Sequence, residues 1–560
     1  KKKKKKAEDA RLAAKSQVVP IHLEEMEPLI EVEPDPPVQQ LHAPPTPTLT
    51  APQDDTPAKS TTSSIQSHLR VNPDKLLDSY GKYGRMQLLG HFLCQYLTLL
   101  YSASLFVVTY TSNEPETTCV SSNGTLISNA CDHQSECVDG TYNNTDTKPV
   151  GSIFIWYNIT CGNKFLIEAG ATSYVMGAMI VVPIFCRLAD KYGRKPLLLI
   201  SLYSSLFINC IIPVAPWYPF YIVLRFLLGA TSDAYLSISA LLTVELICQD
   251  ARPIITLLST TGFALGLLWI GFLSLFISDW QYLYTATIAP GFLTVIYFCC
   301  LTESPYWLAS HDQTHDLKDY CKKANKMNGT NVNYRECIEE KGKPPEHHVR
   351  FRDLLKHRDI IKGIAINGLA QFTLSTSYYS ISFMATRITA STPTLGFMIL
   401  AAAEIPGGVL SMVLMNHFGR RTLVVVSFIM QGLSLFATPF LGSEVAVLIA
   451  LSFLKVFNTI CFAVHPIFVA ESVPTSVRSL VASIVNIPQS AGMLLGPFFK
   501  YATDWNPHIS YIGLAIQSAV AGGILMFLKE TKGMDLPEDL DDLNRDRSQY
   551  NRRKISGSQL

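Results

Sequence analysis

The stretch Arg187–Lys195, RLADKYGRK, is a knot of charge between two long apolar runs. The runs, Phe165–Cys186 and Pro196–Pro216, are each close to the roughly 20 apolar residues that a helix needs to span a bilayer. A short basic segment with a glycine between two such spans is typical of a cytoplasmic loop, because Lys and Arg gather on that side. The stretch therefore predicts a cytoplasmic turn between two membrane helices.

The landmarks of this stretch recur later in the chain at a constant offset. Adding 226 to Gly193 gives Gly419, which lies in Asn416–Arg421 (NHFGRR), again between two apolar runs. Four landmarks in one register predict two parallel copies of one membrane unit, the internal symmetry expected of a transporter. The other pairs in this register are Glu245 with Glu471, Arg252 with Arg478 and, at an offset of 227, Glu303 with Glu530.

The composition is that of a membrane protein. The 560 residues are 48% hydrophobic and 16% charged, and the formal net charge is only +1. Such near-neutrality gives no indication of a nucleic-acid partner. We expect no cleavable signal peptide, because Lys1–Lys6 is followed by acidic and Pro-rich sequence rather than an apolar core.

Changes in composition divide the chain into five parts. The first part mixes charge, Ser, Thr and Pro with few aromatic residues, so we expect it to be disordered. The stretch between the two halves is rich in Lys, whereas connections on the opposite side are poor in Lys and Arg, so both termini should be cytoplasmic. The parts are a disordered cytoplasmic tail (1–84), a six-helix N-terminal half (85–302) that includes a polar loop (111–164), a cytoplasmic linker (303–358), a six-helix C-terminal half (359–530) and a cytoplasmic tail (531–560).

The polar loop has the features of an oxidised, glycosylated extracellular segment. Four cysteines and three acceptor sequons fall within it. Four cysteines permit three pairings, and spacing does not choose among them. The alternative is a reduced, flexible loop. The linker sequon at Asn328 should remain unmodified. The loop cysteines are Cys119, Cys131, Cys137 and Cys161, and its sequons begin at Asn123, Asn143 and Asn158.

Several motifs resemble those of a known family. RLADKYGRK resembles the signature between the second and third helices of the major facilitator superfamily. LTESPYWL at Leu301–Leu308, ESVPTSVRSL at Glu471–Leu480 and ETKG at Glu530–Gly533 narrow the resemblance to the organic cation and anion transporter family. The resemblance implies an all-α membrane protein of twelve transmembrane helices, arranged in two six-helix, parallel-repeat halves. Its motifs do not choose the substrate.

Ionisable side chains within the spans are candidate functional residues, because desolvating them inside a bilayer is costly. Asp233, Glu404 and Lys455 lie near the middle of their spans, about where a facilitator binds its cargo. Glu404 is followed by Pro406, which cannot donate a backbone hydrogen bond and so loosens the helix. The other ionisable residues in the spans are Arg225, His91 and His465.

The resemblance suggests roles for some of these residues and for two tyrosines. Glu404 matches a glutamate that cation-carrying members hold in their eighth helix, and Lys455 stands where the family usually keeps Lys or Arg. Tyr378 and Tyr379 match aromatic residues of the seventh helix, whose ring faces suit an organic cation or an aromatic solute. The alternative role for the tyrosines is packing.

Two positions depart from the family and affect the sign of the cargo. Ser490 stands where cation carriers have Asp and anion carriers have Arg, and Asp233 stands where several cation carriers have Lys. Because Lys455 can neutralise only one of Asp233 and Glu404, the cavity should keep about one negative charge. That charge favours an organic cation, or a zwitterion whose carboxylate meets Lys455, over an organic anion. An Arg225 side chain folded onto Asp233 would make the cavity neutral and favour the zwitterion.

Charges at the cytoplasmic ends of both halves form a candidate conformational lock. Pairs between them would hold the halves together on the inside while the outside is open, and a bound solute would shift that equilibrium. The second repeat has Asn416 where the first has Asp190, so the lock should be asymmetric. The alternative is that these charges only orient the helices. The residues are Asp190, Arg194, Glu245, Arg252, Glu471 and Arg478.

We therefore predict a plasma-membrane carrier that moves a small organic ion by alternating access, with no cofactor and no metal site. An enzyme is disfavoured, because the chain has no HExxH, no GxSxG and no P-loop. Two alternatives stay open, an organic anion carrier of the same family and a receptor or scaffold that kept the fold and lost transport. The solute, the coupling ion and the oligomeric state cannot be predicted from the sequence.

Overall fold

The structure is a computed structural model, which describes most of the chain beyond residue 68. The described residues are 69–112, 116–121, 126–128, 143–145, 150–159, 164–248, 253–311, 313–340, 357–389, 392–474 and 477–532.

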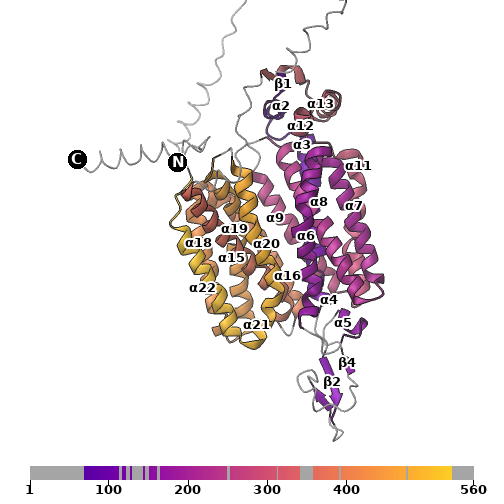
Figure 1. Cartoon of the computed structure of the whole chain (residues 1–560), viewed down its shortest axis with the longest axis vertical. Helices are drawn as coiled ribbons and strands as arrows, with labels where there is room; N and C mark the ends of the chain where they lie inside the picture. The colour runs from indigo at the N-terminus through magenta and orange to yellow at the C-terminus, as the bar shows by residue number, and fades with distance from the viewer. Residues whose placement is uncertain are drawn as a thin grey trace, which may run out of the picture. The chain divides into compact units, whose positions relative to one another are not determined.

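Two bundles of long helices form the two halves, which Figure 1 shows side by side. The first half contains α3 (Arg85–Phe106) with α4 (Val108–Thr111), α6 (Lys164–Tyr192), α7 (Arg194–Ile211) with η3 (Ile212–Val214), α8 (Tyr218–Leu246), α9 (Pro253–Ser274), and α10 (Trp280–Thr287) with η5 (Ala289–Ile296) and α11 (Tyr297–Cys300). The second half contains α15 (Arg358–Ile388), α16 (Pro393–Ala402) with α17 (Glu404–His417), α18 (Arg420–Ala437) with η7 (Thr438–Phe440), α19 (Glu444–Glu471), α20 (Arg478–Leu495) with η9 (Gly496–Phe498) and α21 (Phe499–Trp505), and α22 (Pro507–Leu525).

The helices are those of a membrane protein. Within the described residues, 11 helices are long and apolar enough to cross a bilayer. The remaining long helix, α15, has 31 residues but is too polar to count among them, because buried Ser, Thr, Asn and Gln side chains line much of its length. The predicted all-α architecture of two six-helix halves is confirmed.

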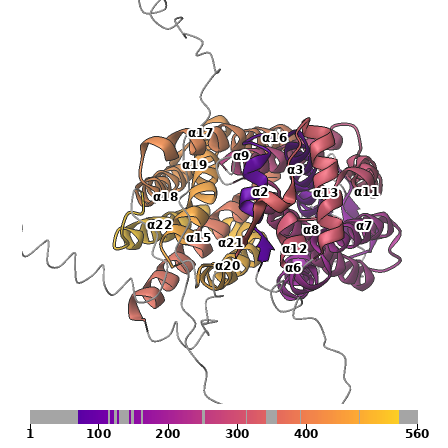
Figure 2. The same ribbon diagram turned by 90° about the horizontal axis from the view of Figure 1, so that it is seen from above.

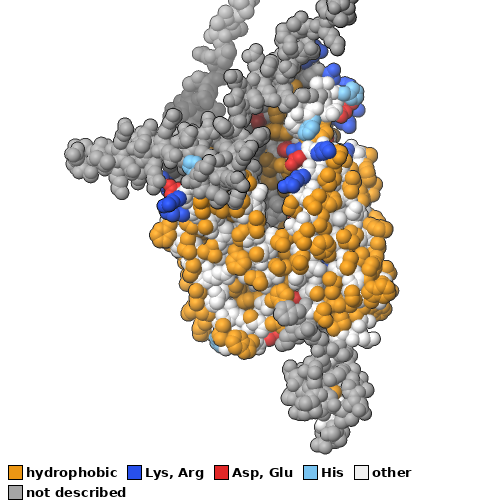
Figure 3. Space-filling model, viewed as in Figure 1, with side chains coloured by type: hydrophobic (Ala, Val, Ile, Leu, Met, Phe, Trp, Pro, Cys, Tyr) orange, Lys and Arg blue, Asp and Glu red, His pale blue; other side chains and the backbone are white. Residues whose placement is uncertain are grey.

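The face of the bundles in Figure 3 is largely apolar. Large side chains such as Phe207, Phe292 and Phe527 are 67%, 78% and 84% exposed. A broad apolar surface of this kind is unfavourable in water and fits the hydrocarbon core of a bilayer. The charged side chains visible in Figure 3 gather mainly beyond one end of the apolar body.

Prolines account for the interrupted helices. Pro406 has no N–H to donate to the carbonyl one turn earlier, and the helix is broken between α16 and α17 beside it. Pro290 stands at the start of η5, where the sixth span changes from α-helix to 3₁₀-helix. Such breaks are tolerated within a membrane where neighbouring helices cover the freed backbone groups.

The predicted loop at Arg187–Lys195 is wrong in its extent. Helix α6 continues to Tyr192, and α7 begins at Arg194, so only Gly193 separates them. Gly193 has φ +105°, and a Cβ there would lie 2.6 Å from a carboxylate oxygen of Glu303. The backbone conformation therefore favours glycine, and a side chain there would have to displace that carboxylate. Charged residues beside it are good helix formers at a wet helix end, which is why the helix does not stop at the first charge.

Short elements gather at the end of the bundles that we call the linker face. Strand β1 pairs antiparallel with β5, and α12 and α13 lie against α3 and α8 when viewed from this face (Figure 2). The indole nitrogen of Trp307 donates to the carbonyl of Asp190 at 2.8 Å, which attaches α12 to the end of α6. The elements are β1 (Leu69–Val71), α2 (Pro73–Ser79), α12 (Pro305–Ser310), α13 (Thr314–Asn328), η6 (Tyr334–Cys337) and β5 (Ile338–Glu340).

The predicted disordered tail at residues 1–84 is wrong for its last part. Residues 69–79 form β1 and α2, and the Asn72 side chain accepts from the backbone N–H groups of Asp74 and Lys75 at 3.0 and 3.3 Å. Such an N-cap satisfies donors that a helix leaves unpaired. A local cap and a two-stranded pairing with a distant strand are both invisible to a reading based on composition. Residues 1–68 lie outside the described residues.

We call the opposite end the cap face, because strands β2 (Glu116–Val120), β3 (Leu126–Ser128) and β4 (Asn143–Thr145) project from it (Figure 1). Strand β2 lies between β3 and β4, and both pairings are antiparallel. Helix α5 (Ile153–Trp156) follows, and Asn158 just beyond it is exposed. Cys119 is disulfide-bonded. The candidate sites Cys131, Cys137, Cys161 and Asn123 lie outside the described residues.

Candidate functional site

Three candidate residues of the C-terminal half meet in one buried cluster. Lys455 Nζ lies 3.0 Å from Glu404 Oε1, and the Tyr378 hydroxyl donates to the same oxygen at 2.8 Å. Lys455 Nζ also donates to Ser382 Oγ at 2.5 Å and lies 3.6 Å from the centroid of the Tyr378 ring. Glu404 and Lys455 are only 3% and 2% exposed. The cluster is therefore an internally satisfied ion pair, whose net charge is zero.

The local fold explains how these side chains meet. Glu404 is the first residue of α17 and directly follows the break between α16 and α17. Its carboxylate therefore projects from a loosened turn of the helix. Tyr378 and Ser382 are four residues apart on α15 and therefore lie on one helix face. Lys455 comes from α19, which packs against both α15 and α17. Three helices of one half thus converge on a single carboxylate.

The candidate acid of the N-terminal half has a different environment. Asp233 on α8 is half-buried, and the Tyr101 side chain lies beside its carboxylate. Among the described residues, no Lys or Arg nitrogen lies within 4.0 Å of its carboxylate. Among the described residues, Asp233 therefore has no basic partner of the kind that Lys455 provides for Glu404.

Arg225 does not fold onto Asp233. Its Nε donates to the carbonyl of Gly170 at 3.1 Å, and its Nη1 donates to the carbonyl of Ser104 at 3.0 Å. The guanidinium also lies over the Tyr174 ring, 4.9 Å from the centroid, and the residue is fully buried. The described residues therefore contain no Arg225–Asp233 ion pair, which would have neutralised the Asp233 carboxylate.

Aromatic side chains from both halves pack against one another near the two acids. Tyr379 stacks on Phe106 with centroids 6.1 Å apart, and Tyr378 meets Phe263 edge-on at 6.2 Å. Tyr101 also contacts Phe263, at 6.3 Å. Phe106, Phe263 and Tyr101 belong to the first half, and the tyrosine pair belongs to the second. The tyrosines predicted to line the cargo site thus lie in an aromatic layer that joins the halves.

The remaining candidate residues within the spans are Ser490 and the two histidines, His91 and His465. Ser490 on α20 is half-buried, next to Gln489, which accepts from the Gln371 amide at 2.8 Å. Both ring nitrogens of buried His91, and Nε2 of buried His465, have no hydrogen-bond partner in the described part of the chain. The geometry assigns none of the three a defined contact with the acids.

The predicted lock residues form pairs inside each half. Arg194 Nε lies 3.1 Å from Glu245 Oε2, and Arg194 Nη2 lies 3.2 Å from Asp190 Oδ1. In the second repeat, Arg420 Nε lies 3.4 Å from Glu471 Oε1. Each pair joins neighbouring helices of the same half at the linker face. Arg252 lies outside the described residues, and Nε and Nη2 of Arg478 have no hydrogen-bond partner among the described ones.

The glutamates at the offset of 227 have a role that sequence reasoning missed. Glu303 accepts from the backbone N–H groups of Arg194 at 3.0 Å and Lys195 at 3.1 Å, at the start of α7. Glu530 does the same for Arg421 at 3.1 Å and Thr422 at 3.2 Å, at the start of α18. Each carboxylate fills donors that the helix leaves unpaired and faces the positive end of its dipole. The repeat in the sequence marked these glutamates as equivalent positions but gave no sign of the groups that they cap.

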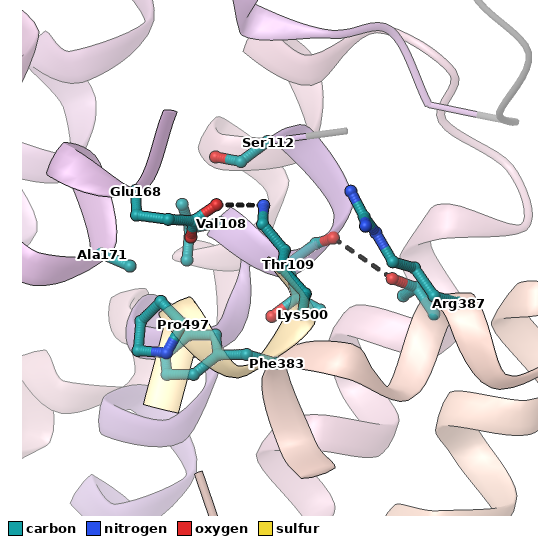
Figure 4. A pocket seen from close by; sticks show the side chains of 10 residues that line it. Val108, Thr109, Ser112, Glu168, Ala171, Phe383, Arg387, Pro497 and Lys500 are labelled. Carbon is teal, nitrogen blue, oxygen red and sulfur yellow. Dashed lines mark hydrogen bonds and ion pairs between the residues drawn. The ribbon is translucent and has the colours of Figure 1, made fainter. Parts of the chain in front are cut away.

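A second set of functional candidates lies at the cap face, and the sequence did not reveal it. Glu168 of α6 forms an ion pair with Lys500 of α21, and Tyr501 donates to Glu168 Oε1 at 3.0 Å. The Glu168–Lys500 pair lines a pocket between the halves, which Figure 4 shows from close by. Both charges stand at the ends of predicted spans, where charged residues are ordinary, so nothing in the sequence marked them.

Comparisons with known proteins agree with this architecture. A family model described as sugar (and other) transporter matches residues 86–539. A Caenorhabditis elegans protein whose name assigns it provisionally to the transporters is 31% identical over 513 residues, covering 88% of each chain. The organic cation transporter protein of Drosophila melanogaster is 26% identical, covering 71% of this chain and 74% of its own. Solute carrier family 22 member 2 of Rattus norvegicus is also 26% identical, covering 72% and 73%.

Solved structures resemble the fold. The inward-open xylose transporter XylE from E. coli superposes with a TM-score of 0.59 at 14% identity, covering 80% of this chain and 98% of that one. At this level of identity the likeness concerns the fold alone.

Proposed function

The chain belongs to the sugar (and other) transporter family of the major facilitator superfamily, and from this premise we propose that it carries a small organic cation, or a zwitterion, by alternating access. The proposal is supported above all by the contrast between two acids. Glu404 is neutralised by Lys455, whereas Asp233 has no basic partner within 4.0 Å among the described residues. Asp233 is therefore the acid of the site without a paired cation, since the Arg225 guanidinium is bonded to backbone carbonyls instead.

The negative charge of Asp233 should discriminate strongly between cationic and anionic cargo. Two unit charges 4 Å apart interact by about 4 kcal/mol at an effective dielectric constant of about 20, before desolvation is subtracted. A cation gains this attraction beside Asp233, and an anion meets a repulsion of similar size. Tyr101 beside the carboxylate adds a ring face of the kind that attracts organic cations. A zwitterion would need a separate partner for its carboxylate, because Lys455 is already engaged by Glu404.

Uptake into vesicles that contain the purified protein tests this proposal and separates a carrier from a receptor. We expect accumulation of labelled organic cations of the size of an aromatic amine, and little accumulation of an aromatic carboxylate. Binding of a cation without accumulation would instead favour the receptor. Robust uptake of the carboxylate alone would overturn the proposed sign of the cargo.

We also propose that the linker face is cytoplasmic and the cap face extracellular in the plasma membrane. The Lys-rich α13 lies at the linker face, as the preference of basic residues for the cytoplasm requires. Glycosidase mapping should find glycan on one or more of Asn123, Asn143 and Asn158, and none on Asn328. The Asn328 amide is already engaged, since it donates to Gln87 at 3.0 Å and its oxygen accepts from Met86 N–H at 3.0 Å. Glycan at Asn328 would reverse the topology.

In this structure the ion pairs of the linker face join helices of one half. We propose that the same charges join the two halves in a second conformation, in which the linker face is closed. Arg478 supports this idea, because two of its buried nitrogens have no hydrogen-bond partner among the described residues and are available to a carboxylate of the other half. Replacing Arg194 by Ala should leave Asp190 and Glu245 without their shared cation and disfavour the outward-open form. Labelling of an engineered cysteine from the cap face should then slow. Unchanged labelling in a folded variant would leave these charges as topology signals only.

A further inference from the structure

At the cap face, one carboxylate of the N-terminal half contacts two side chains of the C-terminal half. Glu168, near the start of α6, forms an ion pair with Lys500 and accepts from the Tyr501 hydroxyl at 3.0 Å. Glu168 and Lys500 are only 5% and 8% exposed. Figure 4 shows the two side chains pointing at each other from α6 and α21, beside the pocket that lies between the halves.

Further contacts at this end also cross between the halves. The Thr386 hydroxyl of α15 donates to the carbonyl of Thr109 at 3.5 Å, a bond drawn in Figure 4. Ser274 and Thr394 hydroxyls lie 3.3 Å apart where α9 meets α16. These bonds join neutral groups, so within the described part of the chain Glu168–Lys500 is the charged contact between the halves at this face. The ion pairs at the linker face, by contrast, join helices of one half.

The cap face also contains an ion pair that cannot join the halves. Arg387 Nη1 lies 3.2 Å from Asp504 Oδ2, and both residues belong to the C-terminal half, on α15 and α21. Any rigid movement of one half against the other leaves this pair intact. It therefore serves as a matched control of similar chemistry at the same face.

We propose that the Glu168–Lys500 ion pair, with the Tyr501 hydroxyl, is a latch that holds the cap face closed. The pair exists only while the halves meet at this face, so its free energy enters the closed form and not the form that opens there. When the halves part, Glu168 and Lys500 each gain water instead of each other. The proposal rests on the alternating-access movement proposed above, but its test requires no knowledge of the solute.

Thiol labelling of a reporter cysteine measures the opening directly. Ala171 lines the same pocket and is 2% exposed, so Ala171→Cys is hidden while the latch is closed. The protein is held in lipid nanodiscs, where a membrane-impermeant maleimide reaches both faces, and labelling by native cysteines is subtracted using protein without the reporter. Glu168→Gln and, separately, Lys500→Gln should each raise the labelling rate about tenfold or more, which corresponds to about 1.4 kcal/mol.

Two further variants make the result decisive. The exchange Glu168→Lys with Lys500→Glu rebuilds the pair in reverse and should return labelling to the parent rate, which a general loosening of the fold would not do. Asp504→Asn breaks the pair within one half and should leave labelling unchanged. Parent-like labelling in both single variants, in folded protein, would overturn the latch. The single variants could raise the labelling rate as expected while the parent protein takes up no organic cation. That result would contradict the proposed function and support the latch.

Discussion

Replacing Asp233 by Asn should reduce uptake of an organic cation about a hundredfold while leaving the amount of protein at the cell surface unchanged. The substitution conserves size and shape, so packing around α8 is preserved. It removes the one acid in the site that has no basic partner among the described residues. A hundredfold effect corresponds to about 2.8 kcal/mol, which is within the roughly 4 kcal/mol that a charge pair at 4 Å supplies before desolvation.

The measurement is the initial rate of uptake of a labelled cation, divided by the surface amount of each variant. Asp504→Asn is a matched control, because the same chemical change is made at a residue 53% exposed and outside the site. Asp233→Glu should recover part of the lost uptake, since it restores the charge at a slightly different distance. Undiminished cation uptake in Asp233→Asn would remove the central argument for the sign of the cargo.

The features that follow from periodicity could be predicted from the sequence. The offset of 226 placed Gly193 and Gly419 at equivalent turns, and the related offset of 227 marked Glu303 and Glu530. What these glutamates do could not be predicted, because the capped N–H groups lie about 108 residues earlier in the chain. A repeat identifies equivalent positions, whereas a hydrogen bond between distant segments appears only once the helices are packed.

The sequence singled out the ionisable residues of the spans but could not show which of them pair. Asp233, Glu404 and Lys455 stood out because ionisable residues in a span are rare. Sequence alone could not decide which acid Lys455 neutralises, since this depends on how α15, α17 and α19 converge. The pair Glu168–Lys500 was missed for a different reason. Charged residues at the end of a span have ready access to water, so only their burial, at 5% and 8% exposure, shows that they matter.

The second large effect is expected at Lys455. Lys455→Met keeps a long, flexible, apolar side chain but leaves the Glu404 carboxylate, only 3% exposed, with the Tyr378 hydroxyl as its donor. Removing one member of a buried ion pair typically costs about 3–5 kcal/mol, because the other charge remains buried without compensation. We therefore expect a marked fall in the midpoint of thermal unfolding and in surface amount. Glu404→Gln, which strands the lysine instead, should behave similarly.

The double variant, Lys455→Met with Glu404→Gln, decides what this pair is for. It removes both charges, while the new amide can still accept from the Tyr378 hydroxyl, so most of the lost stability should return. Because the pair is neutral as a whole, the site keeps the charge of Asp233, and the double variant should still prefer a cation. A double variant as unstable as Lys455→Met would show that other groups depend on these charges. A stable double variant that no longer takes up cations would instead place the pair in direct contact with the cargo, because structure would be restored and recognition would not.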